Sequence, residues 1–459
     1  MEKDQDYLLN NREKFTRELL DFITIPSIAA LPEHAKDVHR AATWLQQKMS
    51  GVGIENVEIM DTGGQPAVYG DWMHAGNGKP TVLIYGHFDV QPVDPVELWD
   101  HDPFTPTIID EKIFARGASD DKGSMFIPII VFEAIHKSSG TFPFNIKFLF
   151  EGEEEIASPK MPEFVSNNVD KLKCDMIFSA DGGQFSESEP NLAVGFKGIL
   201  GFDIEVIGPE TDKHSGLFGG AIANPIMALT QLLSSMKNTD GQITIDGFYD
   251  EVVPLNNEDK AEIARVPFNE KQYLNLTGSV GLDGETGYTA PERIGARPTL
   301  DVNGIWGGYQ GVGTKTVLPS KANAKITCRL VANQKPKEIL KKIEKHVKKF
   351  LPNGVVGKVI PLQDEGDPLL IPKNHRSTEV ARDVLRKVYG KEPYMIRVGG
   401  SIPILSAFYK YLGIHATMFA FQLDDENWHA PNEFFRLSSF YKGQEAYRQL
   451  FHKIGGLSK

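Results

Sequence analysis

Short apolar runs that alternate with helical segments constrain the fold of this 459-residue chain most strongly. TVLIYG, FNIKFLF and CDMIFSA begin near residues 81, 144 and 174 and have the length and composition of buried strands. Apolar residues at helical spacing separate them. The expected helices lie at 8–25, 34–49, 124–137 and 377–389. This alternation predicts an α/β fold with a mostly parallel sheet and helices on both faces.

The pattern changes near residue 190, where longer strands with alternating faces begin, and it returns after about residue 370. We therefore expect a main α/β domain at 1–188 and 370–459. A smaller α+β domain at 189–369 would be inserted into it. Within this insert, 241–268 and 276–289 are rich in turn residues and predict long connections.

Composition excludes several classes of protein. The net charge of −12 makes nucleic acid and acidic membranes unsuitable partners. No apolar run is long enough to span a bilayer. Two cysteines, Cys174 and Cys328, exclude a disulfide framework and a cysteine-based zinc finger. The charged N-terminal stretch does not look like a secretory signal, so we expect a cytoplasmic protein.

Metal-capable side chains occur in five stretches that follow a predicted strand or lie in a turn. They are His87 and Asp89, Asp120 and Asp121, Glu153 to Glu155, Asp181, and His429. Each stretch alone is typical of ordinary structure, such as an acidic turn or a helix start. The carboxyl ends of strands in an α/β sheet meet in one crevice, however, where so many carboxylates need a cation. Histidine with carboxylate and no thiol indicates zinc or a similar hydrolytic metal, not calcium.

Eight motifs carry a specific resemblance that covers almost the whole chain: YGHFDV, GASDDKG, EEIAS, SADGG, DKHSG, CRL, GGSIP and NWHAPNE. With them the sequence resembles the dinuclear zinc peptidase family of carnosinase, cytosolic nonspecific dipeptidase, carboxypeptidase G and succinyl-diaminopimelate desuccinylase. The likeness is closest to the cytosolic nonspecific dipeptidases, through KTVLPSKANAKITCRLVAN and GGSIPI. The resemblance implies that the main domain is catalytic and that the insert is a lid through which a homodimer forms.

The resemblance also implies two zinc ions per subunit, with manganese or cobalt left open. One metal site would use His87, Asp120 and Asp181, and the other Asp120, Glu155 and His429, so that Asp120 bridges the metals. It further implies a cis peptide bond after Asp120. Asp89 would accept the second N–H of His87 and fix its tautomer.

Three consecutive glutamates leave the register of the EEIAS motif to be decided. Matching Ile156, Ala157 and Ser158 to the end of the family motif makes Glu154 the general base and Glu155 the metal ligand. Ala157 stands where the family has glycine.

The remaining implied roles concern the substrate and lie outside the metal centre. They fall on His214, Thr316, Arg329, Gly400 and Ser401. His214 would reach the site of a neighbouring subunit and stabilise the oxyanion, and Arg329 would hold the free carboxylate of a small peptide. The carnosinase group has a further histidine where this chain reads LQDEGDPLLIP, so whether it cleaves carnosine stays open.

The sequence therefore predicts a dizinc metallopeptidase that hydrolyses dipeptides with a free C-terminal carboxylate. An N-acyl amino acid deacylase or a carboxypeptidase of the same family would use the same metals and the same Arg329. A third hypothesis is a non-catalytic scaffold, and the complete set of ligands together with Glu154 and Asp89 argues against it.

Overall fold

The structure, a computed structural model, describes residues 2–459 and divides into two compact units. The first unit comprises Met1–Ala193, Ile371–Met395 and Pro403–Lys459, and the second comprises Val194–Leu370 and Ile396–Ile402. Met1, the start of the expected main domain, lies outside the described residues. Residues 396–402, expected in the main domain, group with the second unit instead. The catalytic and lid roles of the two domains stay predictions.

A six-stranded sheet forms the centre of the first unit. Its strands, in spatial order, are β1 (Glu55–Met60), β2 (Ala67–Trp72), β6 (Asn145–Glu151), β3 (Thr81–His87), β7 (Met176–Ser179) and β18 (Ala416–Met418). β6, β3, β7 and β18 run parallel. At one edge of the sheet, β2 pairs antiparallel with β6 and β1 pairs antiparallel with β2. The mostly parallel sheet is therefore confirmed.

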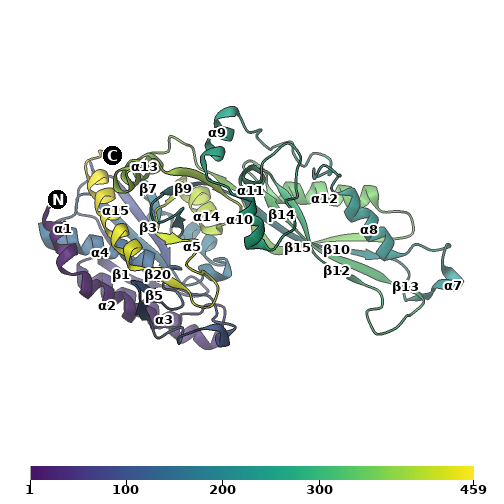
Figure 1. Cartoon of the computed structure of the whole chain (residues 1–459), viewed down its shortest axis with the longest axis horizontal. Coiled ribbons are helices and arrows are strands. Elements are labelled where there is room, and N and C mark those ends of the chain that lie inside the picture. The colour runs from purple at the N-terminus through teal and green to yellow at the C-terminus, as the bar shows by residue number, and fades with distance from the viewer. Residues whose placement is uncertain (1) are drawn as a thin grey trace. The chain divides into compact units, whose positions relative to one another are not determined.

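Helices cover both faces of this sheet (Figure 1). They are α1 (Glu2–Asn10), α2 (Arg12–Ile23), α3 (Ala35–Val52), α4 (Lys122–Ser139), α5 (Met161–Asn167), α6 (Val169–Leu172), α13 (Arg376–Tyr389), α14 (Pro403–Leu412) and α15 (Leu437–Gly455). Consecutive strand residues point to opposite faces. In β3, the Tyr85 ring packs against Phe408 of α14, with centroids 5.4 Å apart. A Cβ on the next residue, Gly86, would lie 2.8 Å from Met125 of α4. These two helices therefore lie on opposite faces, as predicted.

The helix expected at 8–25 is two helices, α1 and α2, which are separated at Asn11. Asn10 and Asn11 are weak helix formers, because their amides compete with the helical main-chain hydrogen bonds. Within residues 2–459, no helix combines the length and the apolar character needed to cross a membrane.

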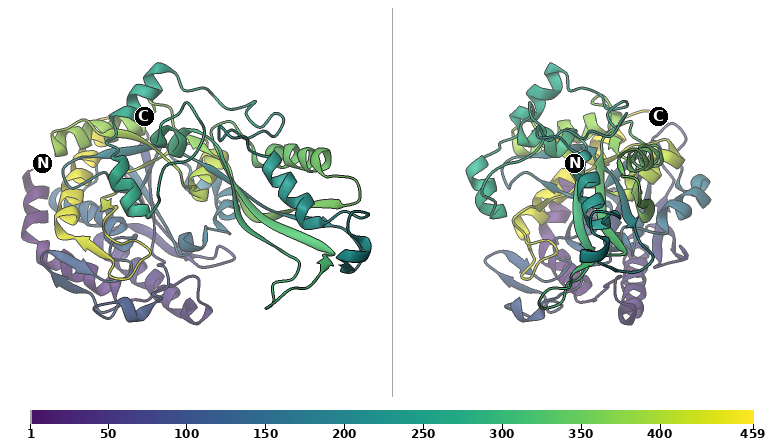
Figure 2. Two further views of the ribbon diagram at one scale, coloured as in Figure 1. Left: turned by 45° about the vertical axis from the view of Figure 1, so that its right-hand side comes forward. Right: turned by 90° about the vertical axis from the view of Figure 1, so that its right-hand side faces the viewer.

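A four-stranded antiparallel sheet forms the second unit. Its strands are β12 (Thr299–Gly307), β14 (Lys321–Leu330), β10 (Gly198–Ile207) and β15 (Val356–Gly366), in that order. Figure 2 shows α8 (Pro225–Ser235) and α12 (Pro336–Phe350) along this sheet. Alternate residues of β14, from Ala322 to Leu330, are buried in the core that these helices share. Arg329 lies between two of these buried residues and therefore points to the other face of the sheet.

The turn-rich stretch at 241–268 contains a helix, α9 (Asn257–Arg265), that the sequence analysis did not predict. Asn256 and Asp259 form a capping box in which each side chain accepts the other residue's main-chain N–H. An asparagine followed three residues later by aspartate was the available signal.

Candidate metal centre

Three predicted ligands of the first unit lie at or just beyond the carboxyl ends of three neighbouring parallel strands. His87 is the last residue of β3, Asp181 follows β7 by two residues, and a short 3₁₀ turn, η3 (Glu154–Ile156), follows β6. Because β6, β3 and β7 are adjacent and parallel, their carboxyl ends lie side by side. Asp120 lies just before α4, and His429 lies between β19 (Gln422–Leu423) and β20 (Phe434–Arg436).

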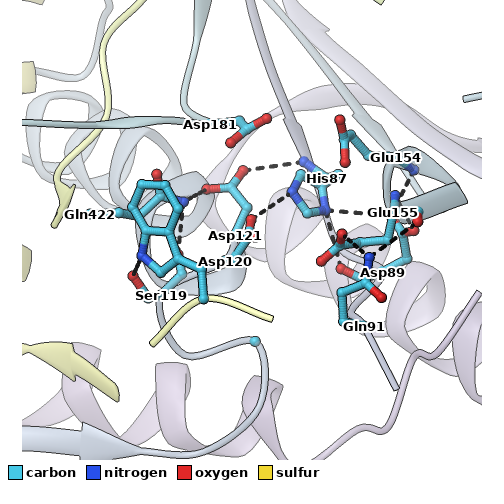
Figure 3. A network of polar contacts seen from close by, with 12 residues as sticks. His87, Asp89, Gln91, Ser119, Asp120, Asp121, Glu154, Glu155, Asp181 and Gln422 are labelled. Atoms are coloured by element: carbon cyan, nitrogen blue, oxygen red, sulfur yellow. Dashed lines mark hydrogen bonds and ion pairs between the residues drawn. The ribbon is translucent and has the colours of Figure 1, made fainter. Parts of the chain in front are cut away.

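Two groups of three side chains near these strand ends have ligand atoms within 4.8 Å of one another. The groups are His87, Asp120 and Asp181, and Asp120, Glu155 and His429. They are the two ligand sets that the sequence resemblance implied. The structure brings all five side chains together, and Figure 3 labels His87, Asp120, Glu155 and Asp181.

Asp120 belongs to both groups and offers one oxygen to each. Its Oδ1 lies 3.2 Å from Nε2 of His87, and its Oδ2 lies 3.0 Å from Nε2 of His429. Nε2 of His429 is also 3.1 Å from Oε2 of Glu155. A carboxylate whose two oxygens face two separate ligand groups can bridge two cations. The peptide bond between Asp120 and Asp121 is cis, as the resemblance implied.

The electrostatics of the centre fit a cation. Burial, followed by the charge of Asp120, raises the pKa of Glu155 to about 7. Burial likewise raises the pKa of Asp181 to about 6, with Asp120 again contributing. Hydrogen bonds to Asp120 and Glu155 raise the pKa of His429 to about 10. Protonation thus relieves crowded negative charge, and divalent cations bound by the same donors would relieve it without protons.

Glu154 belongs to neither ligand group. Burial raises the pKa of its carboxyl well above the usual value, and the charges of Asp181, Glu155 and Asp120 act in the same direction. A buried carboxyl with a raised pKa can take up and release a proton, as general acid–base catalysis requires, and the role of Glu154 as the base stays a prediction.

Asp89 contacts more of the centre than the sequence analysis expected. Nδ1 of His87 lies 3.1 Å from the main-chain oxygen of Asp89 and 3.4 Å from its Oδ1. The carboxylate also accepts two main-chain N–H groups, from Glu154 at 3.1 Å and from Glu155 at 3.0 Å. Asp89 therefore connects the histidine at the end of β3 to the glutamates that follow β6.

Glu433 was missed by the sequence analysis, although it ends the NWHAPNE motif. Its carboxylate is fully buried and accepts the main-chain N–H groups of Ser119 at 2.9 Å and of Asp120 at 3.0 Å. It also accepts hydrogen bonds from the main chain of Gly117 at 3.0 Å and from Nη1 of Arg116 at 2.7 Å. Glu433 thus holds the turn that presents Asp120.

The five residues predicted to bind substrate all lie in the second unit. Nη1 of Arg329 donates to Oγ of Ser401 at 3.0 Å, and that hydroxyl donates to the main-chain oxygen of Lys197. Gly400 accepts the main-chain N–H of Lys197 at 3.0 Å. The structure therefore brings Arg329, Gly400 and Ser401 together around Lys197.

His214 is the last residue of β11 (Lys213–His214). Thr316 directly precedes β13 (Val317–Leu318), the strand that pairs with β11. The main-chain N–H of Ser215 donates to the oxygen of Thr316 at 2.9 Å. Nδ1 of the exposed His214 accepts the main-chain N–H of Gly216 at 3.0 Å. In the neutral ring, Nε2 therefore carries the proton and is the free donor.

Comparison with known proteins identifies the family. The model for Peptidase family M20/M25/M40 matches residues 83–453. The chain belongs to this family. As an M20 member it is a metallopeptidase, and the family includes dinuclear metal-binding peptidases. The resemblance drawn from the sequence motifs is confirmed.

Relatives match the chain over 96% or more of its length. The Cys-Gly metallodipeptidase dug1 of Schizosaccharomyces pombe is 30% identical, over 100% of this chain and 99% of the relative. The M20 metallo-carboxypeptidase Sso-CP2 from Sulfolobus solfataricus has a TM-score of 0.82 at 30% identity and covers 96% of this chain and 99% of its own. Human carnosine dipeptidase 1 has a TM-score of 0.77 at 28% identity and covers 99% of both chains.

Proposed function

We propose that the protein is a dipeptidase that hydrolyses dipeptides with a free C-terminal carboxylate at a dinuclear zinc centre. The observation that carries this proposal is the position of Asp120, one oxygen toward each of two three-ligand groups. Relatives named as acting on Cys-Gly and on β-Ala-His support a dipeptide substrate. Histidine and carboxylate donors without thiol favour zinc, and manganese and cobalt suit the same donors.

His87, Asp120 and Asp181 would hold one ion, and Asp120, Glu155 and His429 the other. When bound, the pair would supply an acidified water and a Lewis acid for the scissile carbonyl. Glu154 lies outside both ligand groups, so its carboxylate is available to accept the proton of the attacking water. The same group would return that proton to the leaving amine.

Arg329 would bind the terminal carboxylate of the dipeptide. Arg329 is half-buried, and Oγ of Ser401 accepts a hydrogen bond from one of its guanidinium N–H groups. The remaining N–H groups suit a planar, bidentate carboxylate. Thr316 and the main chain of Gly400 are proposed to complete the peptide-binding surface.

We also propose a homodimer formed through the second unit. β12 is an edge strand of its sheet, and Ile305 on it is 55% exposed. Leu217 and Met227, on α7 (Ser215–Phe218) and α8, are 76% and 57% exposed. An unpaired strand edge and exposed apolar side chains each favour association. Nε2 of His214 would then donate to the oxyanion in the partner's site.

The cytoplasmic location is likewise a proposal. Cys174 and Cys328 are both free thiols, which fits a reducing compartment.

The likeness to Sso-CP2 favours a carboxypeptidase as the second candidate, and an N-acyl amino acid deacylase would use the same anchor. A substrate series tests all three. We expect the zinc-loaded protein to cleave dipeptides with a higher kcat/KM than tripeptides, longer peptides and N-acetyl amino acids. Faster cleavage of longer peptides would establish the carboxypeptidase, and faster cleavage of N-acetyl amino acids would establish the deacylase.

A further inference from the structure

Three alternate residues, from the last residue of β3 onward, contact the candidate metal centre. His87 is a candidate ligand, and Asp89 accepts hydrogen bonds from the main chain of the glutamate turn. Gln91 follows Asp89 by two residues. Alternate residues of an extended chain point the same way. Nε2 of Gln91 donates to Oε2 of Glu155 at 2.8 Å and to the main-chain oxygen of Glu155 at 3.3 Å (Figure 3).

Glu155 is therefore held at three points by this one segment. Asp89 accepts its main-chain N–H at 3.0 Å, and Gln91 donates to its main-chain oxygen and to its carboxylate. The Oε2 atom that receives the Gln91 hydrogen bond is also the atom 3.1 Å from Nε2 of His429. The carboxylate is 4% exposed, so water has little access to replace the amide as its partner.

The chemistry of an amide suits this position. A neutral N–H donor fixes the carboxylate rotamer and, unlike lysine or arginine, brings no positive charge that would compete with a cation. An oxygen that accepts one hydrogen bond keeps a second lone pair for a metal. Gln91 thus contacts Glu155, which is a member of only one of the two ligand groups.

We propose that Gln91 is a positioning residue that presets Glu155, so that it sets the affinity of the metal site formed by Asp120, Glu155 and His429. This inference rests on the proposed metal centre. Since ordering a ligand in advance removes that entropy cost from metal binding, the contact favours occupation of this site. Partners of metal ligands typically contribute about 10- to 100-fold in affinity.

Zinc titration of the metal-free protein against a chromophoric chelator tests the inference without using activity. Gln91→Met keeps the length of the side chain and removes its donor. We expect one zinc to bind as in the wild type and the second to bind about 10- to 100-fold more weakly. Gln91→Asn, whose amide is one methylene shorter, should give the same selective loss if the methionine variant does not fold.

Gln46→Met is the matched control. Its Nε2 also donates to a main-chain oxygen of the first unit, that of Val57 at 3.3 Å, and Gln46 is in neither ligand group. This variant should bind both zinc ions normally. If Gln91 only stabilised the loop in general, Gln91→Met would weaken zinc binding at both sites. The reason is that His87, a member of the other ligand group, lies on the same segment.

Two results would overturn the inference. One is a Gln91→Met protein that binds both zinc ions with wild-type affinity, and the other is an equal loss at both sites. A wild-type protein that binds fewer than two zinc ions would instead refute the proposed metal centre, and the role of Gln91 would fall with it.

Discussion

The main-chain N–H of Glu154 donates a hydrogen bond to Oδ1 of Asp89 at 3.1 Å, between two residues 65 positions apart in the chain. The other oxygen of Asp89 holds the next residue, Glu155. This arrangement holds the main chain of the second and third of three consecutive glutamates, and the roles of Glu154 as base and Glu155 as ligand stay predictions.

Substitution of each glutamate tests the assigned roles. Glu154→Ala should keep two metal ions per chain and lower kcat by about 10²- to 10⁴-fold, the usual contribution of a general base. Glu155→Ala should lose one metal ion first. Metal content by mass spectrometry, measured beside steady-state rates, separates the two. Metal loss in Glu154→Ala, with metal retained in Glu155→Ala, would contradict the assignment of Glu154 as the base and Glu155 as the ligand.

Arg329→Ala should lower kcat/KM for free dipeptides strongly. Loss of one partner of a desolvated charge pair costs about 2–5 kcal/mol, or roughly 30-fold to several thousand-fold. The wild-type protein should also cleave C-terminally amidated dipeptides poorly. Arg297→Ala is the control, because that arginine is committed to Glu285 through two hydrogen bonds of 2.7 Å. Equal rates on amides and free acids would exclude a carboxylate anchor.

Glu433→Ala should destabilise the first unit by roughly 3–5 kcal/mol, because it leaves the Arg116 guanidinium buried without its counter-charge. The turn that presents Asp120 would also lose its acceptor. Urea unfolding of chelator-treated protein measures the change. Asp203→Ala, which removes an exposed ion pair with Lys325, should cost only about 0–1 kcal/mol. Similar costs for the two variants would contradict this account of Glu433.

His214→Ala should inactivate the protein without removing metal. If His214 serves the partner's site, mixing His214→Ala with Glu154→Ala should restore activity in proportion to the heterodimer formed, because one site then holds both groups. A histidine that served its own chain would give no recovery. Verified heterodimers without activity would exclude the shared site.

Much of the architecture follows from the sequence, because strand ends are local signals. The alternation of apolar runs with helical segments indicated the parallel sheet, and the charged residues after the β3, β6 and β7 runs indicated where the ligands meet. Gln91 and Glu433 could not be assigned in this way. Their partners lie 64 and more than 300 positions away in the chain, and a lone glutamine before Pro92 or a glutamate after Asn432 has no local pattern that indicates a contact. Helix α9 was missed because its capping box lies among residues that are typical of turns.

The central claim is that Asp120 bridges two metal ions, and X-ray absorption spectroscopy of the zinc-loaded protein tests it most directly. We expect two zinc ions per chain, a metal–metal distance of about 3.5–4 Å, and nitrogen and oxygen ligands only. Asp120→Ala should then lose both ions, whereas Asp181→Ala should keep one. A single zinc per chain, or two without a metal–metal vector, would contradict the account.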